Sequence, residues 1–272
     1  MQLKAADAVT ARMKHLLIAS LLLLPAWSAA VAEDSGTFRV RVGAGAQMRP
    51  RFVGADKSSL VPLFHVNFAR GTKQFSFGAP DDSPSIAVVS KNGFSFGPAG
   101  NIEGRRKASD VGAPVGSVPT TLRAGAFAQY TAGDSFRLRG ELLKAINGHH
   151  GLVGSIGADK IWRSGDRYVF SIGPRVLFSD ARFQRAYFGV SPAASLASGL
   201  PAYRPGSGVY AVAAASGVSY QLGGGPWGVF GYARYERLVG HAAKSPIIRE
   251  FGSRNQFSGG IGLNYTFTIH AY

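Results

Sequence analysis

The sequence predicts an all-β protein: a closed antiparallel transmembrane β-barrel of about twelve strands, preceded by a cleaved N-terminal signal peptide. Three observations lead to this prediction. The chain begins with an export signal, it continues with segments in which apolar and polar side chains alternate, and these segments are joined by short turns and long loops in regular succession. After the export signal, no apolar run approaches the length of a membrane helix.

The N-terminal region has the parts of a secretory signal peptide. Basic residues precede the apolar run 16–24, and small residues end in an Ala30-Val31-Ala32 cleavage site. The apolar run is too short to cross a bilayer. We therefore expect residues 1–32 to be removed and residues 33–272 to form one barrel domain in the bacterial outer membrane.

The composition agrees with a membrane barrel. Hydrophobic residues make up 46% of the chain, 36 of its 272 residues are glycine, and charged residues are only 17%, whereas a soluble domain carries about 25%. The absence of cysteine excludes a disulfide framework and a lipidated cysteine. The net charge of +15 favours polyanionic partners. For an exported protein these are outer-membrane lipid and lipopolysaccharide, and nucleic acid is not expected.

Twelve candidate strands are defined by the alternation of side chains. The last one shows the pattern most clearly, with Phe257, Ile261 and Leu263 on one face and Ser258 and Asn264 on the other. In a membrane barrel the apolar face contacts lipid and the polar face lines the lumen. The expected strands are residues 37–48, 60–69, 72–79, 84–90, 93–103, 120–131, 134–146, 149–162, 166–178, 206–221, 226–238 and 254–267.

The connections indicate the orientation. Every second connection is a tight turn that contains Gly or Asn, and most of the others are long. Outer-membrane barrels have short periplasmic turns and longer external loops, so both ends of the barrel domain are expected in the periplasm. The long connections are residues 49–59, 104–119, 179–205 and 239–253.

Arginine residues alternate with apolar residues in several of these strands. An arginine facing lipid at the bilayer midplane would cost about 2–4 kcal/mol, so we expect these side chains in the lumen, opposite Glu103, Glu141, Asp159 and Glu236. The bases outnumber these acids, which leaves a narrow anion-preferring pore as an alternative function. The predicted basic ladder consists of Arg39, Arg41, Arg123, Arg137, Arg139, Arg167, Arg175 and Arg234.

Three stretches, residues 43–68, 187–208 and 235–267, together resemble the MipA/OmpV family of outer-membrane proteins. The resemblance implies a scaffold that links a murein lytic transglycosylase to a penicillin-binding protein of the peptidoglycan-synthesising machinery. The residues of the two most specific loop motifs are Tyr187, Phe188, Gly189, Ser191, Pro192, Ser245 and Pro246, and the terminal strand carries a C-terminal assembly signal at Tyr265 and Phe267.

The aromatic residues of the middle motif, Tyr187, Phe188 and Tyr203, have two interpretations. They either pack the long loop on itself, which is the more common case for ordered loops, or fold over the barrel mouth as a plug.

No residues suggest catalysis, a metal site or a cofactor. Ser171 and Ser258 have no histidine and acid companions at strand-compatible positions, so we expect that the protein is not an enzyme. His149 and His150 are neighbours on an extended chain, cannot chelate together, and are expected in a solvated loop. Asp81 and Asp82 are explained by turn propensity. A scaffold is therefore the preferred function, with a narrow anion-preferring porin or a surface adhesin as alternatives.

Overall fold

The computed structural model describes residues 36–270. The expected signal peptide lies outside the described residues and stays a prediction.

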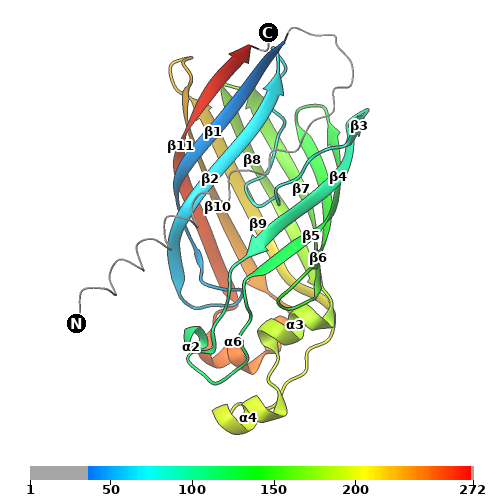
Figure 1. The fold of residues 1–272 in the computed structure, drawn as a ribbon, viewed down its shortest axis with the longest axis vertical. Helices are drawn as coiled ribbons and strands as arrows, with labels where there is room; N and C mark the ends of the chain where they lie inside the picture. Colours follow the sequence, from blue (N-terminus) through cyan, green and yellow to red (C-terminus); the bar gives the residue numbers. More distant parts are fainter. Residues whose placement is uncertain (1–35, 271–272) are drawn as a thin grey trace, which may run out of the picture. The chain divides into compact units, whose positions relative to one another are not determined.

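The described residues form one antiparallel sheet of eleven strands that curls around a lumen (Figure 1). The first and last strands pair with each other, from Thr37 opposite His270 to Met48 opposite Gly259. The sheet order is β2-β1-β11-β10-β9-β8-β7-β6-β5-β4-β3. The strands are β1 (Thr37–Pro50), β2 (Ser58–Arg70), β3 (Val89–Lys91), β4 (Phe94–Glu103), β5 (Thr121–Ala132), β6 (Phe136–Ala145), β7 (Leu152–Ser164), β8 (Tyr168–Ser179), β9 (Gly208–Gln221), β10 (Trp227–Leu238) and β11 (Asn255–His270).

The prediction of a closed barrel is corrected by this topology, because β2 and β3 are the free edges of the sheet. The predicted strand 72–79 is the missing element. Residues 71–84, which we call the inner segment, leave the end of β2 and enter the lumen, where Phe75 is only 4% exposed. The chain then returns along β4, where the Ile86 and Val88 amides donate to the carbonyls of Pro98 and Phe96 at 3.1 and 2.9 Å.

The return of the chain along β4 depends on a glycine. A Cβ atom on Gly97 would lie 1.9 Å from the carbonyl oxygen of Ile86, so a larger residue would push the two segments apart. The predicted strand 84–90 therefore exists mainly as an irregular edge, of which Val89–Lys91 is regular strand.

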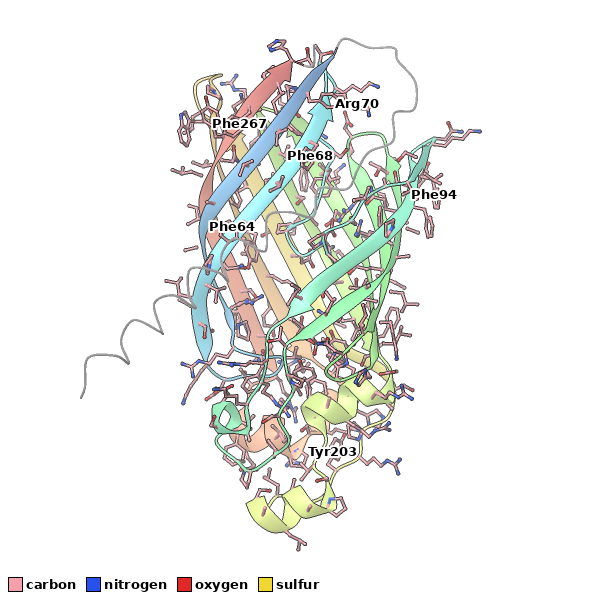
Figure 2. All side chains as sticks on the ribbon, viewed as in Figure 1. Phe64, Phe68, Arg70, Phe94, Tyr203 and Phe267 are labelled. Atoms are coloured by element: carbon pink, nitrogen blue, oxygen red, sulfur yellow. The ribbon has the colours of Figure 1, made fainter. Side chains whose placement is uncertain are left out.

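The outer face of the sheet is apolar, as the alternation predicted. Phe64 is 76% and Ile261 is 71% exposed, whereas Asn264, on the opposite face of β11, is 4% exposed. Phe64, Phe68 and Phe267 lie along the outside of the sheet (Figure 2). This distribution is the one that a bilayer stabilises, because apolar side chains contact lipid and polar ones are kept inside.

The long connections carry short helices at one end of the sheet (Figure 1), which the sequence analysis did not predict. Two of these helices begin with ordinary caps: Asp180 accepts a hydrogen bond from the Phe183 amide, and Ser191 accepts one from the Ala194 amide, with Pro192 in the first turn. Among the described residues, no helix is long and apolar enough to span a membrane. The helices are α2 (Ala108–Val111), α3 (Ala181–Phe188), α4 (Pro192–Ser198), α5 (Gly240–Lys244) and α6 (Pro246–Phe251).

The helices and loops at this end form a cap with an apolar core. Phe183 and Phe188 are completely buried, and Ile247 is 1% exposed. These side chains pack with Tyr210 of β9 and Leu238 of β10, so the cap is continuous with the ends of the strands.

Candidate functional site

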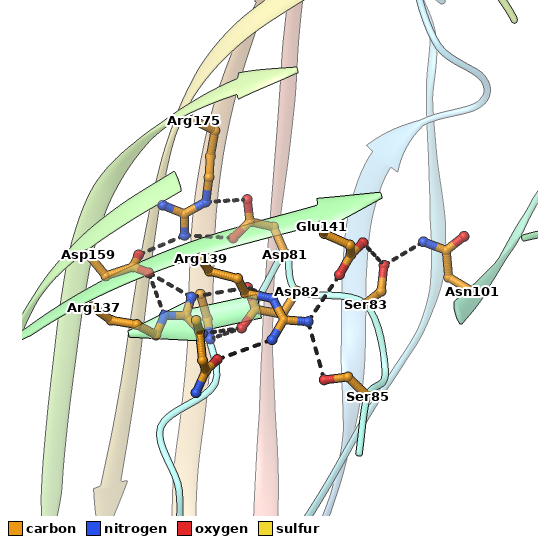
Figure 3. A network of polar contacts seen from close by, with 12 residues as sticks. Asp81, Asp82, Ser83, Ser85, Asn101, Arg137, Arg139, Glu141, Asp159 and Arg175 are labelled. Carbon is orange, nitrogen blue, oxygen red and sulfur yellow. Dashed lines mark hydrogen bonds and ion pairs between the residues drawn. The ribbon is translucent and has the colours of Figure 1, made fainter. Parts of the chain in front are cut away.

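The centre of the lumen is filled by a network of charged side chains, the lumen network (Figure 3). Asp159 of β7 is 1% exposed and lies between two arginines. One carboxylate oxygen accepts a hydrogen bond from Arg137 of β6 at 2.6 Å, and the other accepts one from Arg175 of β8 at 2.7 Å. Buried charges are tolerated only when they are paired and hydrogen-bonded, and this arrangement satisfies both arginines at once.

The inner segment supplies the remaining acids of the lumen network. Asp82 forms ion pairs with Arg137 at 2.5 Å and with Arg139 at 3.6 Å. Asp81 pairs with Arg175 at 3.0 Å and with Arg234 at 3.5 Å. Two adjacent aspartates therefore bind arginines of β6, β8 and β10 and hold the inner segment against the wall.

Serine and asparagine side chains extend these contacts toward β4. The Ser83 hydroxyl donates to Glu141 of β6 at 2.5 Å, and the amide of Asn101 donates to Ser83 at 2.7 Å. Ser83 therefore connects the inner segment to both β6 and β4.

Aromatic residues fix the first half of the inner segment. The guanidinium groups of Arg39 and Arg41 lie 4.9 and 4.3 Å from the centre of the Phe75 ring, and the Phe75 amide donates to Asp166 at 2.9 Å. Cation–π contacts of this kind are stabilised further when they are shielded from water. Phe75 was predicted to lie in a strand of the wall, but it contacts the lumen arginines instead.

The structure places seven of the eight predicted ladder arginines on the inner face. Arg39, Arg123, Arg137, Arg139, Arg175 and Arg234 each form an ion pair there. Arg41 donates to the Thr266 hydroxyl at 3.1 Å and is 6% exposed.

Arg167 is the exception and corrects the prediction. It is exposed in the turn between β7 and β8, because β8 begins only at Tyr168. Its place in the lumen is taken by Arg163, which the sequence analysis missed and which pairs with Asp166 at 3.3 Å.

Asp81 and Asp82 were also missed, because their turn propensity offered a sufficient explanation. The available signal was the imbalance between the predicted lumen bases and the four acids assigned to them. Buried arginines require counter-charges, so the missing acids had to come from elsewhere in the chain.

The two loop motifs meet in the cap. Tyr187 and Phe188, at the end of α3, are 1% and 0% exposed, and the Ser245 hydroxyl donates to the Phe188 carbonyl at 2.7 Å. Gly189 follows α3, Ser191 and Pro192 begin α4, and Pro246 begins α6. The aromatic pair is thus part of a cap core over the end of the sheet, while Tyr203 contributes a hydroxyl that donates to the His241 carbonyl at 2.8 Å.

A buried arginine ties the cap together from another loop. Arg106 is 1% exposed and donates to the carbonyls of Tyr187, Ala186 and Gly116 at 2.7, 2.9 and 2.6 Å. Burial lowers the pKa of Arg106 to about 10, so the side chain is still a cation at neutral pH. A cation at the carboxyl end of a helix is favourable, and here it joins the loop before α2 to the end of α3.

His149 is not in a solvated loop, which corrects that prediction. Its ring is packed against Phe183, with centroids 5.2 Å apart, and its Nε2 atom lies 3.3 Å from Glu103. His150 is exposed, as expected for a solvated loop, so the two histidines have different environments. Within residues 36–270 there is no group of three or more possible metal-ligating side chains around either one.

Two cavities adjoin the inner segment. One, of about 410 Å³, lies toward the cap and is lined by charged residues that include Arg49, Glu103 and Arg234. The other, of about 450 Å³, lies toward the turn between β3 and β4 and is lined by Phe75, Lys91 and other residues. The inner segment contributes to the lining of both.

Aromatic residues gather near the end of β11. Tyr265 contacts Trp227 and Phe267, with ring centroids 4.9 and 4.7 Å apart. Phe267 is 48% exposed on the outer face, and β11 continues to His270. This is the position of an interfacial aromatic girdle.

An antiparallel sheet with an apolar outer face, a charge-paired lumen and an aromatic girdle defines an outer-membrane protein of the β-barrel class. A family model described as MltA-interacting protein MipA matches residues 42–267. The chain therefore belongs to the MipA family.

Comparison with solved structures finds proteins of low sequence identity, two of which are described as outer-membrane proteins. The translocator domain of the autotransporter NalP from Neisseria meningitidis is 16% identical, with a TM-score of 0.37 and coverage of 96% of this chain and 97% of that one. OmpT of Vibrio cholerae is 9% identical, with a TM-score of 0.34 and coverage of 88% and 100%. OprG from Pseudomonas aeruginosa is 11% identical, with a TM-score of 0.25 and coverage of 88% and 99%. Among curated protein sequences, none matches the chain.

Proposed function

We propose that this protein is a non-catalytic scaffold of the outer membrane that binds a murein lytic transglycosylase and links it to the peptidoglycan-synthesising machinery, including a penicillin-binding protein. The family description, MltA-interacting protein, supports a transglycosylase as the partner. The inner segment favours a binding function over transport. Its chain occupies the lumen, and its Asp81 and Asp82 neutralise lumen arginines.

The alternative of an anion-preferring pore loses its main argument for the same reason. It depended on arginines without partners, whereas the inward arginines named above, apart from Arg41, all pair with acids. The adhesin alternative stays a prediction.

A transglycosylase in the periplasm would meet the end of the sheet that carries the tight turns. Lys91, next to the β3–β4 turn, and Arg167, in the β7–β8 turn, are exposed at this end. The inner segment also enters the lumen here, which adds surface that short turns alone would not provide.

The test measures capture of a purified lytic transglycosylase by the detergent-solubilised protein. The turn variant, K91E with R167E, reverses two charges at the end of the sheet that carries the tight turns. The cap variant, R182E with R185E, reverses two charges on exposed arginines of α3 and is the matched control. We expect capture by the parent and the cap variant and at least about tenfold weaker capture by the turn variant, a change of about 1.4 kcal/mol. Absence of capture by the parent would contradict the proposed function.

A further inference from the structure

The wall of the sheet is interrupted beside the end of β4. The returning chain accompanies β4 as far as Gly100, whose amide donates to the Pro84 carbonyl at 3.0 Å. In the part of the chain that the structure describes, no strand pairs with this edge of β4 at residues 101–103. The strand at the other free edge of the sheet, β2, pairs only with β1.

The cavity of about 410 Å³ reaches this interruption. Its lining includes Pro50 and Arg51, at the end of β1, and Ile102 and Gly104, at the end of β4. Ile102 belongs to the outer face of the sheet and is 69% exposed, whereas Arg123, which also lines the cavity, pairs with Glu103 on the inner face at 3.6 Å. Residues of both faces of the sheet therefore line the cavity where the wall is interrupted, and we call this place the side opening.

The charges at the side opening are not balanced. Deeper in the cavity, Arg234 pairs with Glu236 at 2.5 Å and Arg175 pairs with Asp81. Arg49 and Arg51 line the same cavity and are exposed. Neither forms an ion pair or a side-chain hydrogen bond with any other residue in the range 36–270. Two guanidinium groups are therefore free to bind an anion.

The surroundings of the side opening are apolar on the outer face. Ile102 lies at its rim, and Leu60, near the start of the edge strand β2, is 72% exposed. An amphiphile in the leaflet would keep its chain on this apolar surface, a contact that a hydrophilic anion cannot make.

We propose that the side opening binds a phosphate-bearing amphiphile of the surrounding leaflet, with its head group between Arg49 and Arg51 and its apolar chain along Ile102. Guanidinium groups match phosphate oxygens with paired, charge-assisted hydrogen bonds. The chain stays on the lipid-facing side, so binding needs no opening of the cap and no displacement of the inner segment.

The proposal is tested by calorimetric titration of the folded protein in an uncharged detergent with dihexanoyl phosphatidic acid. Dihexanoyl phosphatidylcholine and inorganic phosphate are titrated in parallel, and empty micelles give the baseline. We expect saturable binding of phosphatidic acid at one site and about tenfold weaker binding of the other two probes. Phosphatidylcholine carries a choline cation that offsets the charge of its phosphate, and inorganic phosphate lacks the apolar chains that would contact Ile102.

Variants locate the site. R49Q with R51Q is expected to weaken phosphatidic acid binding about tenfold or more. The matched pair R182Q with R185Q, which removes the same charge from the cap surface, should bind as the parent does. Ile102→Trp, which fills the rim without changing charge, should weaken binding of the amphiphile but not of inorganic phosphate.

Equal weakening in both double variants would show a general charge effect and overturn the proposal. Inorganic phosphate binding as tightly as phosphatidic acid, or an unchanged titration in Ile102→Trp, would also overturn it. Neither readout involves the transglycosylase, so the two proposals fail independently.

Discussion

Asp159 is the residue on which the buried charge of the lumen depends most. It contacts Arg137 and Arg175, both almost completely buried, through separate oxygens. Its neighbours Asp81 and Asp82 each reach only one of these two arginines. Asp159 therefore links the wall strands β6 and β8 to the inner segment through shared partners.

Replacing Asp159 by Asn should destabilise the protein by about 3 kcal/mol, because removal of one partner of a buried ion pair leaves uncompensated charge. The measurement is the midpoint of urea unfolding of the protein folded into lipid vesicles. Asp134→Asn is the matched control, since Asp134 is exposed in the turn between β5 and β6. It should change stability by less than about 0.5 kcal/mol. Equal effects of the two substitutions would contradict the role given to Asp159.

Individual residues of the lumen differ in how far a local sequence pattern predicts their contacts. The inward direction of the arginines followed from alternation and the cost of a cation in lipid. Their partners did not, because Asp81 and Asp82 lie in an irregular segment in which period-2 alternation carries no information. His149 shows the same limit, since its burial depends on α3 from another loop.

At the level of elements, the inner segment is the main departure from the predicted barrel. Its sequence alternates like a strand, yet Phe75 and Phe77 contact arginine side chains in the lumen. Asp81 and Asp82 give this segment charge-assisted hydrogen bonds to lumen arginines, which a strand in the wall would not make. The segment is consequently held by two acids at its turn.

Neutralising both acids should release the inner segment. Ala79, directly before the turn, is 7% exposed, and the chain has no native cysteine, so Ala79→Cys gives a single labelling site. In D81N with D82N, the cysteine should react at least about tenfold faster with a maleimide, a change that corresponds to about 1.4 kcal/mol of lost protection.

Asp134→Asn in the same cysteine background is the control and should label at the parent rate. If the double variant also labels at the parent rate, the ion pairs do not hold the segment.

The long loops that form the cap were predictable from the sequence, but the helices in them and the contacts between them were not. The long loops were clear from the spacing of the strands, and Ser191-Pro192 is an ordinary helix start. The helices are short, however, and their stability comes from contacts between loops, such as those of Arg106 with α3 and Ser245 with Phe188. Contacts of this kind have no local sequence pattern.

At the scale of the whole molecule, the two ends of the lumen are obstructed by different means. The inner segment occupies the centre and the turn end, and the cap core covers the other end. Charge pairing in the centre of the lumen also removes the electrostatic reason for anions to pass through it.

The purified protein should therefore be electrically silent in a planar bilayer, under conditions in which a general porin gives large steady currents. Insertion is checked independently by protease protection of the reconstituted protein. Regular anion-selective steps from the parent chain would revive the pore function and count against the scaffold.

Local sequence patterns were enough to predict the antiparallel all-β fold, the direction of the strands' apolar faces, the inward arginines and the membership of the MipA family. These follow from local periodicity, from the energetic cost of charge in lipid and from motifs within single loops. Three features became apparent only in the folded chain: the sheet is open between β2 and β3, Asp81 and Asp82 complete the lumen network, and the two loop motifs join in one cap. Each of these depends on pairing between residues far apart in the chain, and the free energy of such pairs is set by burial and geometry that no local pattern records.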